Sequence, residues 1–292
     1  MSPPPYQRIS LRIGPPCIAL EGEFDGSRWP LDPAHHRFLE STPSPDLTVR
    51  LRYISLAGTR RWPVFRLGGL AGVYLNGRTW RFQVGGDDAE IRPDRAATLD
   101  ASGAGGTLDL DIEQSPELQS VYPLQYPLEE LLFRHLLADF GSVLLHACGI
   151  SWQGRGYLFV GSSGAGKSTT AGLWKAAGGT MLNDDRTILE ASPGGIRIHA
   201  TPWFGQHPDV GGTATPLHAI FFLRQGPDVA FEPLRPVAAA ALLFAKSFPP
   251  LWDPERLART LEVLEAACRD VPSGWLMVPP DERAVEWVLA QG

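Results

Sequence analysis

Lysine is scarce in this chain of 292 residues. Only three of its 26 basic side chains are lysines, Lys167, Lys175 and Lys246, and the rest are arginines. Acidic side chains outnumber basic ones and give a formal net charge of −6. Because general nucleic-acid-binding proteins usually carry a basic field, we expect no nucleic-acid partner. Because lysine is scarce, the presence of Lys167 inside a glycine-rich loop is hard to attribute to chance.

Cysteine and long apolar runs are lacking as well. Cys17, Cys148 and Cys268 lie far apart and form no CxxC pair, so we expect reduced thiols rather than a zinc site or a disulfide framework. No apolar run approaches the roughly 20 residues that a transmembrane helix needs. The N-terminus lacks the charged start and apolar core of a signal peptide. We therefore expect a soluble, cytoplasmic protein that does not contact membranes.

The hydrophobic fraction of 43% is typical of a globular protein, and the pattern predicts two domains. Residues 1–120 have β character, because 47–54 alternate apolar and polar side chains. The pair Asn76-Gly77 predicts a type I′ hairpin turn between strands at 72–75 and 79–84. Further short strands are expected at 8–13, 18–23 and 107–112.

Residues 121–292 mix helices and strands. Apolar residues recur at helical spacing from Pro127 to Phe140. Apolar or alternating runs predict strands at 142–152, 157–160, 180–183, 187–191, 196–200 and 217–223. Further helices are expected at 167–177, 237–246, 254–270 and 281–289. The pattern favours a nucleotide-binding α/β domain with a mixed sheet and several hairpins.

The strongest motif is Gly161-x-x-x-x-Gly166-Lys167-Ser168, which stands between an apolar strand and a helix as a P-loop does. Glycines let the backbone curl so that its N–H groups converge on anionic oxygens, and the helix adds the positive end of its dipole. Lys167 is expected to reach the β- and γ-phosphates, and Ser168 to ligate Mg²⁺. We therefore predict binding of ATP with Mg²⁺, against the alternative of a simple turn. The predicted ATP-binding residues are Gly161, Ser162, Ser163, Gly164, Ala165, Gly166, Lys167, Ser168 and Thr169.

Candidate catalytic groups flank this loop in the predicted order of elements. Asp184-Asp185 ends the strand after the loop's helix, where one carboxylate can hold Mg²⁺ and the other can accept a proton from a hydroxyl. Neighbouring side chains on a strand face opposite ways, so both can act at one site only if the backbone turns here. A solvated acidic turn is the alternative. His146 has, by its apolar surroundings alone, the pattern of a core histidine.

Two further features have an open interpretation. The segment 201–208 is rich in aromatic and turn-forming residues, and it is expected either to border the site or to be an ordinary packed loop. Extra positive charge at the site could come from Lys246 or from the arginines Arg186, Arg224 and Arg235, and the sequence selects none of them.

Residues 142–200 resemble the catalytic domain of HPr kinase/phosphorylase, whose fold is similar to that of ATP-dependent phosphoenolpyruvate carboxykinase. The resemblance rests on order and spacing. Leu144-Leu145-His146-Ala147 is followed by a short hairpin, the loop 161–168, and then fifteen residues to Asp184-Asp185-Arg186. It implies a mixed-sheet catalytic domain over 121–292, preceded by a β-rich domain over 1–120 for which it implies no role.

By this resemblance, His146 lies beside the carboxylate that activates the acceptor hydroxyl. Asp184 is implied as the base, and Asp185 as a metal ligand together with Ser168. Two departures matter: Thr169 stands where the family usually has glutamate, and a later segment with arginine and phenylalanine is not found. Both argue against HPr as substrate and against phosphorylase activity. The chain is more similar to the peptide- and protein-serine kinases of bacterial biosynthetic clusters.

These observations predict an ATP- and Mg²⁺-dependent kinase that transfers the γ-phosphoryl group to a hydroxyl, on serine of a peptide or small protein. Two alternatives stay open: a nucleotide-dependent binding or regulatory protein without transferase activity, and a small-molecule kinase. The acceptor, the preferred nucleotide base and the oligomeric state are left open by the sequence.

Overall fold

The computed structural model divides the chain into two compact units. The first comprises 1–12 and 16–136, and the second comprises 13–15 and 137–292. This division lies later than the boundary at 120 that the sequence suggests. The residues that the structure describes are 6–23, 31–56, 62–85, 93–100, 104–111, 113, 115–119, 121–162, 164–208, 211–212 and 214–291.

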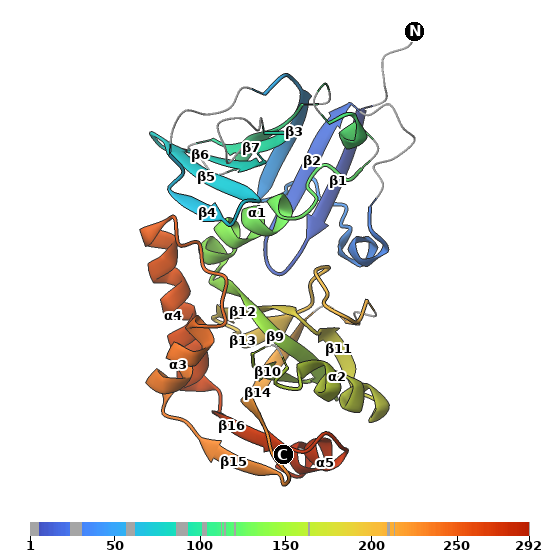
Figure 1. Ribbon diagram of the computed structural model, residues 1–292, viewed down its shortest axis with the longest axis vertical. Helices are drawn as coiled ribbons and strands as arrows, with labels where there is room; N and C mark the ends of the chain where they lie inside the picture. Colours follow the sequence, from blue (N-terminus) through green and yellow to red (C-terminus); the bar gives the residue numbers. More distant parts are fainter. Residues whose placement is uncertain are drawn as a thin grey trace. The chain divides into compact units, whose positions relative to one another are not determined.

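The first unit is built on one mixed sheet of eight strands in the order β1-β2-β3-β8-β7-β6-β5-β4 (Figure 1). The pairs β2–β3 and β3–β8 are parallel, and the others are antiparallel. The strands are β1 Tyr6–Arg12, β2 Cys17–Glu23, β3 Leu47–Tyr53, β4 Phe65–Leu67, β5 Ala71–Asn76, β6 Thr79–Val84, β7 Arg95–Leu99 and β8 Gly105–Leu110. Its β character agrees with the sequence prediction, although Ile112, at the end of an expected strand, lies outside the described residues.

The hairpin between β5 and β6 differs in one detail from its prediction. Asn76 pairs with Thr79, so the two central residues of the turn are Gly77 and Arg78 rather than Asn76 and Gly77. Gly77 has a φ of 62°, whereas Arg78 is not among the described residues with positive φ. A type I′ turn needs positive φ at both central positions, so that assignment was wrong. A glycine at the first central position with positive φ is the pattern of a type II′ turn.

One α-helix covers part of this sheet. Helix α1, Leu128–Leu137, brings the ring of His135 to 5.3 Å from Trp80 and 5.4 Å from Phe82, measured between ring centroids. Trp80 and Phe82 lie on the same face of β6 because they are two residues apart. The short 3₁₀ helices of the chain are η1 Pro33–Phe38, η2 Pro116–Gln119 and η3 Ala138–Phe140.

The second unit contains another mixed sheet of eight strands. The order is β10-β9-β12-β13-β14-β16-β15, with β11 also paired to β9 and β10 also paired to β14. The strands are β9 Ser142–Trp152, β10 Arg155–Val160, β11 Thr180–Asn183, β12 Arg186–Ser192, β13 Gly195–His199, β14 Ala214–Gln225, β15 Ala230–Pro233 and β16 Ser273–Val278. The fold is therefore α/β with mixed sheets. Most strands match their predicted ranges, but β15 and β16 were not predicted.

Strand β9 changes partners along its length, and this positions the site. On one edge, its residues 142–146 pair with β12, and 149–151 pair with β11. On the other edge, its residues 147–152 pair with β10, through a hairpin closed by Gln153 and Gly154. Both turn residues have positive φ, at 49° and 79°, as a type I′ turn requires.

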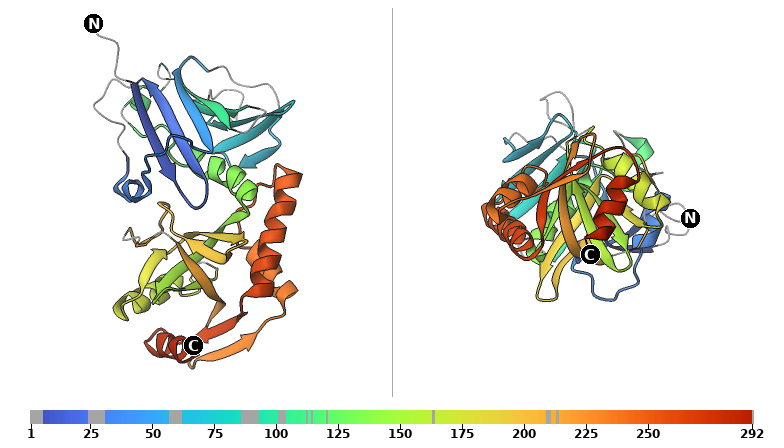
Figure 2. Two further views of the ribbon diagram at one scale, coloured as in Figure 1. Left: turned by 180° about the vertical axis from the view of Figure 1, so that it is seen from behind. Right: turned by 90° about the horizontal axis from the view of Figure 1, so that it is seen from below.

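Helices lie on both faces of the second sheet (Figure 1, Figure 2). The helices of this unit are α2 Lys167–Ala176, α3 Pro236–Phe244, α4 Pro254–Asp270 and α5 Arg283–Ala290. Helices α2 and α5 pack against each other and share one apolar core with β9, β10, β14 and β16, whereas α4 contacts β9, β12 and β13 and carries α3 beside it. Among the described residues, no helix is both long and apolar enough to cross a bilayer.

The largest side chain of the core under α2 is Trp174. It is 1% exposed, and its ring stacks on Tyr157 with centroids 5.1 Å apart. Truncation would leave a large cavity, because the surrounding strands cannot close over it. We expect Trp174→Ala to lower the free energy of unfolding by about 3–5 kcal/mol in urea titrations. The exposed neighbour Lys175→Ala should cost less than about 1 kcal/mol, and equal losses would contradict this view of the core.

Candidate functional site

The glycine-rich loop connects β10 to α2 and turns tightly at both ends. A Cβ on Gly161 would lie 2.7 Å from the Cβ of Ala165, which is too close for any other residue. Gly166 has a φ of 103°, in the region that favours glycine, and it caps α2 without a side-chain hydrogen bond. The first N–H groups of α2 are therefore not taken up by a side-chain cap. Ser163, one of the predicted loop residues, lies outside the described residues.

Lys167 is held inside this loop and is only 8% exposed. Its Nζ donates to the carbonyl oxygens of Gly161, at 2.9 Å, and Ser162, at 3.3 Å. The same Nζ lies 3.1 Å from Nε2 of His146. Burial lowers the pKa of the Lys167 ammonium; the charge of Asp185 opposes this effect and that of Lys246 adds to it. A buried cation thus lies where the loop and β9 meet.

A buried asparagine, Asn183, stands directly before the two aspartates and binds the backbone that follows. Oδ1 of Asn183 accepts from the backbone N–H groups of Asp185, at 2.7 Å, and Arg186, at 2.6 Å. Its Nδ2 donates to the carbonyl of Thr201 at 3.0 Å. Hydrogen bonds that an asparagine side chain accepts from the N–H groups that follow it stabilise a turn. The backbone therefore turns between β11 and β12, which is the condition under which both aspartates can lie at one site.

Asp184 points into the protein, where it is 3% exposed. Its carboxylate accepts three backbone N–H groups, from Gly205 at 2.8 Å, Gln206 at 2.7 Å and His207 at 3.1 Å. An ionised carboxylate offers about four lone-pair positions, so most of its capacity is used here. Asp184 therefore anchors the segment 205–207 and has little capacity left to accept a proton from a substrate. Of the two alternatives for 201–208, the structure supports the one in which it borders the site.

Asp185 is more accessible, with its side chain 28% exposed, and it joins His146 to Arg186. Its Oδ1 lies 3.0 Å from Nδ1 of His146, and its Oδ2 accepts a hydrogen bond from Nη1 of Arg186. Burial alone would raise the pKa of the Asp185 carboxyl, but the hydrogen bond from His146 and the charges of Arg186 and Lys167 hold it below its ordinary value. Asp185 is therefore ionised at neutral pH.

The His146 ring has three polar contacts, and one tautomer serves two of them. Its Nδ1 lies 3.0 Å from Oδ1 of Asp185 and 3.3 Å from Nη1 of Arg186, and its Nε2 lies 3.1 Å from Nζ of Lys167. If Nδ1 carries the proton, it can donate to Asp185, and Nε2 is then free to accept from the Lys167 ammonium. His146 is thus not the enclosed core histidine that its apolar neighbours suggested. The ring of Phe248 also lies beside His146, with 6.5 Å between the two ring centroids. The Arg186 guanidinium lies over the Phe248 ring, 4.2 Å from its centroid.

The glycine-rich loop, His146 and both aspartates line a cavity of about 400 Å³, which we call the loop cavity. Of the predicted site residues, it brings together His146, Gly164, Gly166, Lys167, Ser168, Thr169, Asp184 and Asp185, whereas Gly161, Ser162 and Ala165 are not part of its lining. The described residues contain no cluster of three or more His, Cys, Asp or Glu side chains that could hold a metal ion by themselves. Mg²⁺ often keeps several waters and binds through one or two protein groups plus phosphates, so a hydroxyl and a carboxylate in one cavity are compatible with it.

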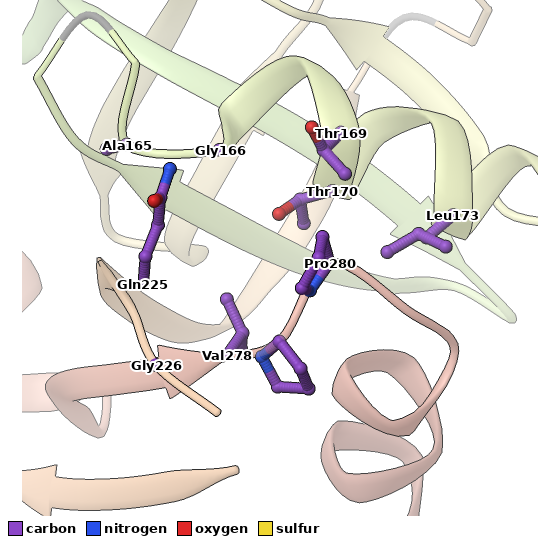
Figure 3. A pocket seen from close by; sticks show the side chains of 10 residues that line it. Ala165, Gly166, Thr169, Thr170, Leu173, Gln225, Gly226, Val278 and Pro280 are labelled. Carbon is purple, nitrogen blue, oxygen red and sulfur yellow. The ribbon is translucent and has the colours of Figure 1, made fainter. Parts of the chain in front are cut away.

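A second cavity, the side cavity, adjoins the first and has a volume of about 380 Å³. It shares Gly166, Thr169 and Gln225 with the loop cavity. Figure 3 shows side chains converging on it from α2, from the end of β14 and from the end of β16. Its apolar lining comes from Ala165, Leu173, Val278, Pro279 and Pro280. The two cavities together give the site an apolar part and a charged part on either side of the N-terminus of α2.

Some groups at the site were missed or left undecided by the sequence. Gln225 donates from Nε2 to the carbonyl of Gly164 at 2.7 Å, and no motif marks it. Lys246 and Arg186 both reach the site, whereas the guanidinium of Arg224 lies over Trp275 at 3.6 Å. The three cysteines are buried and free. Burial raises the pKa of the Cys148 thiol, which disfavours the reactive thiolate.

Part of the chain matches a known family model. Residues 128–271 match the family described as SynChlorMet cassette protein ScmC, and the match covers just under half of the chain. The matched range contains the glycine-rich loop, His146 and both aspartates. No curated protein matches the chain. The chain is therefore similar to ScmC proteins over the part that lines the loop cavity.

Measurements of unfolding free energy and amide hydrogen exchange can test the different surroundings of the two aspartates. Asp184→Asn puts an NH₂ group against backbone donors, so we expect it to lower the free energy of unfolding by about 1–3 kcal/mol. Hydrogen exchange of the Gly205, Gln206 and His207 amides should become faster. Asp185→Asn should leave the exchange of these three amides unchanged. Unaltered exchange in Asp184→Asn would show that Asp184 does not anchor this segment.

Proposed function

We propose that this protein is an ATP- and Mg²⁺-dependent phosphotransferase that transfers the γ-phosphoryl group to a hydroxyl, on serine of a peptide or small protein. The observation that carries the proposal is the convergence of a buried lysine, a tight glycine loop at a helix N-terminus, and an ionised carboxylate on one cavity. Transfer of a phosphoryl group needs mainly positioning and charge neutralisation, which these groups can supply.

The charged part of the site suits the phosphates. The open N–H groups at the start of α2 and the positive end of its dipole favour anionic oxygens. Within the described part of the chain, the hydrogen-bond partners of Lys167 are carbonyl oxygens and a histidine nitrogen, and phosphate oxygens would be stronger acceptors. Its ammonium can therefore turn from the loop carbonyls to the β- and γ-phosphates without crossing the cavity.

The side cavity suits the nucleoside. It is apolar on one side and meets the loop cavity at Gly166 and Thr169. The ribose would be joined to the phosphate chain at this point. Its volume lies in the range of small-molecule sites, and apolar lining with few polar groups is their usual composition. Among the polar groups, the Gln225 amide is fixed by its bond to Gly164 and keeps its carbonyl oxygen for a ligand donor.

The groups that face the loop cavity indicate where the metal ion and the acceptor hydroxyl would bind. Ser168 would hold Mg²⁺, which when bound neutralises charge on the phosphate oxygens. We assign the proton-accepting role to Asp185 instead of Asp184, because Asp184 is saturated by backbone donors. In this assignment Asp185 is no longer the metal ligand that the resemblance implied. His146 orients the Asp185 carboxylate through Nδ1, and Asp184 positions the wall formed by 205–207.

We also propose that the second unit has the fold of HPr kinase/phosphorylase and phosphoenolpyruvate carboxykinase. The order of elements supports this: the β9–β10 hairpin, the loop, α2, β11, and then the aspartate pair before β12. The similarity to ScmC covers this region, but its description names no activity, so the acceptor is inferred from the site alone. Thr169 lines both cavities at the position where HPr kinase/phosphorylase usually has glutamate, and this difference supports a substrate other than HPr.

Nucleotide binding depends on Lys167 in this proposal. We expect Lys167→Ala to weaken ATP binding by roughly 100-fold or more, because a charged hydrogen-bond donor to two phosphates is lost. Isothermal titration calorimetry with Mg·ATP measures this directly. Lys175→Ala removes the same charge from the far end of α2 and should bind like the wild type. Equal affinity in Lys167→Ala and the wild type would contradict the phosphate site.

Phosphoryl transfer depends on Asp185. We expect Asp185→Asn to reduce transfer from γ-labelled ATP to serine peptides, and ATP hydrolysis, by roughly 10²–10⁴-fold. The affinity for Mg·ATP should stay within about threefold, because a general base acts mainly in the transition state. A loss of affinity that appears only with Mg²⁺ would make Asp185 a metal ligand instead. Tight ATP binding by the wild type without any phosphorylated product or ADP would favour a regulatory binding protein.

A further inference from the structure

The edge of β9 is shared by two segments that are far apart in the sequence. Strand β10 pairs with β9 only as far as Val160, which lies opposite Ala147, and the chain then leaves as the glycine-rich loop. Beyond this point the segment 246–248 takes its place. The N–H of His146 donates to the carbonyl of Lys246 at 2.7 Å, and the N–H of Phe248 donates to the carbonyl of Leu144 at 2.8 Å. The backbone of Lys246 is thus hydrogen-bonded to the residue that contacts Lys167.

This pairing places the Lys246 side chain at the loop. Its Nζ donates to Oγ of Ser162 at 3.0 Å. Among the described residues, Lys246 forms no salt bridge with a carboxylate. After burial and the opposing charge of Asp185, the charge of Lys246 is the next cause that shifts the pKa of Lys167, and it lowers it. Two of the three lysines of the chain therefore lie against one loop, close enough to repel each other.

The geometry also indicates which part of a nucleotide Lys246 would meet. The side cavity, proposed for the nucleoside, touches the loop at Ala165 and at Thr169 and Thr170 of α2. Ser162 lies at the opposite, N-terminal part of the loop, next to Lys167 and His146. A phosphate chain that starts at the side cavity and follows the loop therefore ends between Lys167 and Lys246.

We propose that Lys246 is a second cation for the terminal phosphate of the bound nucleotide, brought to the loop by the pairing of 246–248 with β9. This inference rests on the proposed nucleotide binding and adds a residue that distinguishes a triphosphate from a diphosphate. Without nucleotide, the Ser162 hydroxyl holds the ammonium near its working position. With ATP bound, the two ammonium groups neutralise the terminal phosphate together, which removes their mutual repulsion.

The test compares the affinities for ATP and ADP by calorimetry in the wild type, Lys246→Ala, Lys246→Gln, Lys246→Arg and Lys175→Ala. We expect Lys246→Ala and Lys246→Gln to bind ATP roughly 10- to 100-fold more weakly, the loss of one charged hydrogen bond, and ADP within about threefold of the wild type. Lys246→Arg should recover most of the ATP affinity. Lys175→Ala should match the wild type for both nucleotides. Lys246→Gln keeps much of the side-chain stem, so it provides the answer if the alanine variant does not fold.

Three outcomes would overturn the inference. Unchanged ATP affinity in both neutral variants would remove Lys246 from the phosphate site while the proposed function stands. An equal loss for ATP and ADP would show that Lys246 only supports the loop. A wild type that binds neither nucleotide would refute the proposed function itself, and the inference with it.

Discussion

Both edges of β9 need hydrogen-bond partners, and the points at which its partners change gather the site. On one edge, β12 pairs as far as His146, opposite Arg186, and the next N–H, of Ala147, donates to the carbonyl of Asp185. On the other edge, β10 ends opposite Ala147 and the segment 246–248 takes over. A buried strand cannot leave its backbone groups unpaired, so these changes are fixed in register. As a result, His146 and Ala147 of β9 have three kinds of neighbour: the start of the loop, the aspartate pair and Lys246.

The electrostatic arrangement follows from this convergence. Lys167 and Lys246 lie at the loop, and Arg186 is neutralised by Asp185 and held over Phe248. The cavity therefore has a positive side at the loop and helix N-terminus, and an ionised carboxylate facing it. The proposed substrate, an anion whose terminal group reacts with a hydroxyl, fits this separation of charge: its phosphates would be held on the positive side, and the hydroxyl proton would be taken on the other.

Much of this arrangement was predictable because it is written in local patterns. Runs of apolar residues predicted β10 and β14, and the glycines around Lys167 predicted the loop between a strand and a helix. The different surroundings of Asp184 and Asp185 were not predictable, because they depend on hydrogen bonds that Asn183 and the segment 205–207 make in the folded chain.

The position of Lys246 at the loop was also beyond local patterns, because it depends on pairing between segments about a hundred residues apart. The turn at Gly77 was assigned one residue early, since the pair Asn76-Gly77 can stand at two registers of a hairpin. A structure of the protein with Mg²⁺ and a non-hydrolysable ATP analogue tests the central claim most directly. The account predicts the triphosphate along the glycine-rich loop, with its terminal phosphate between Lys167 and Lys246 and facing Asp185. A nucleotide bound elsewhere, or a terminal phosphate turned away from Asp185, would contradict it.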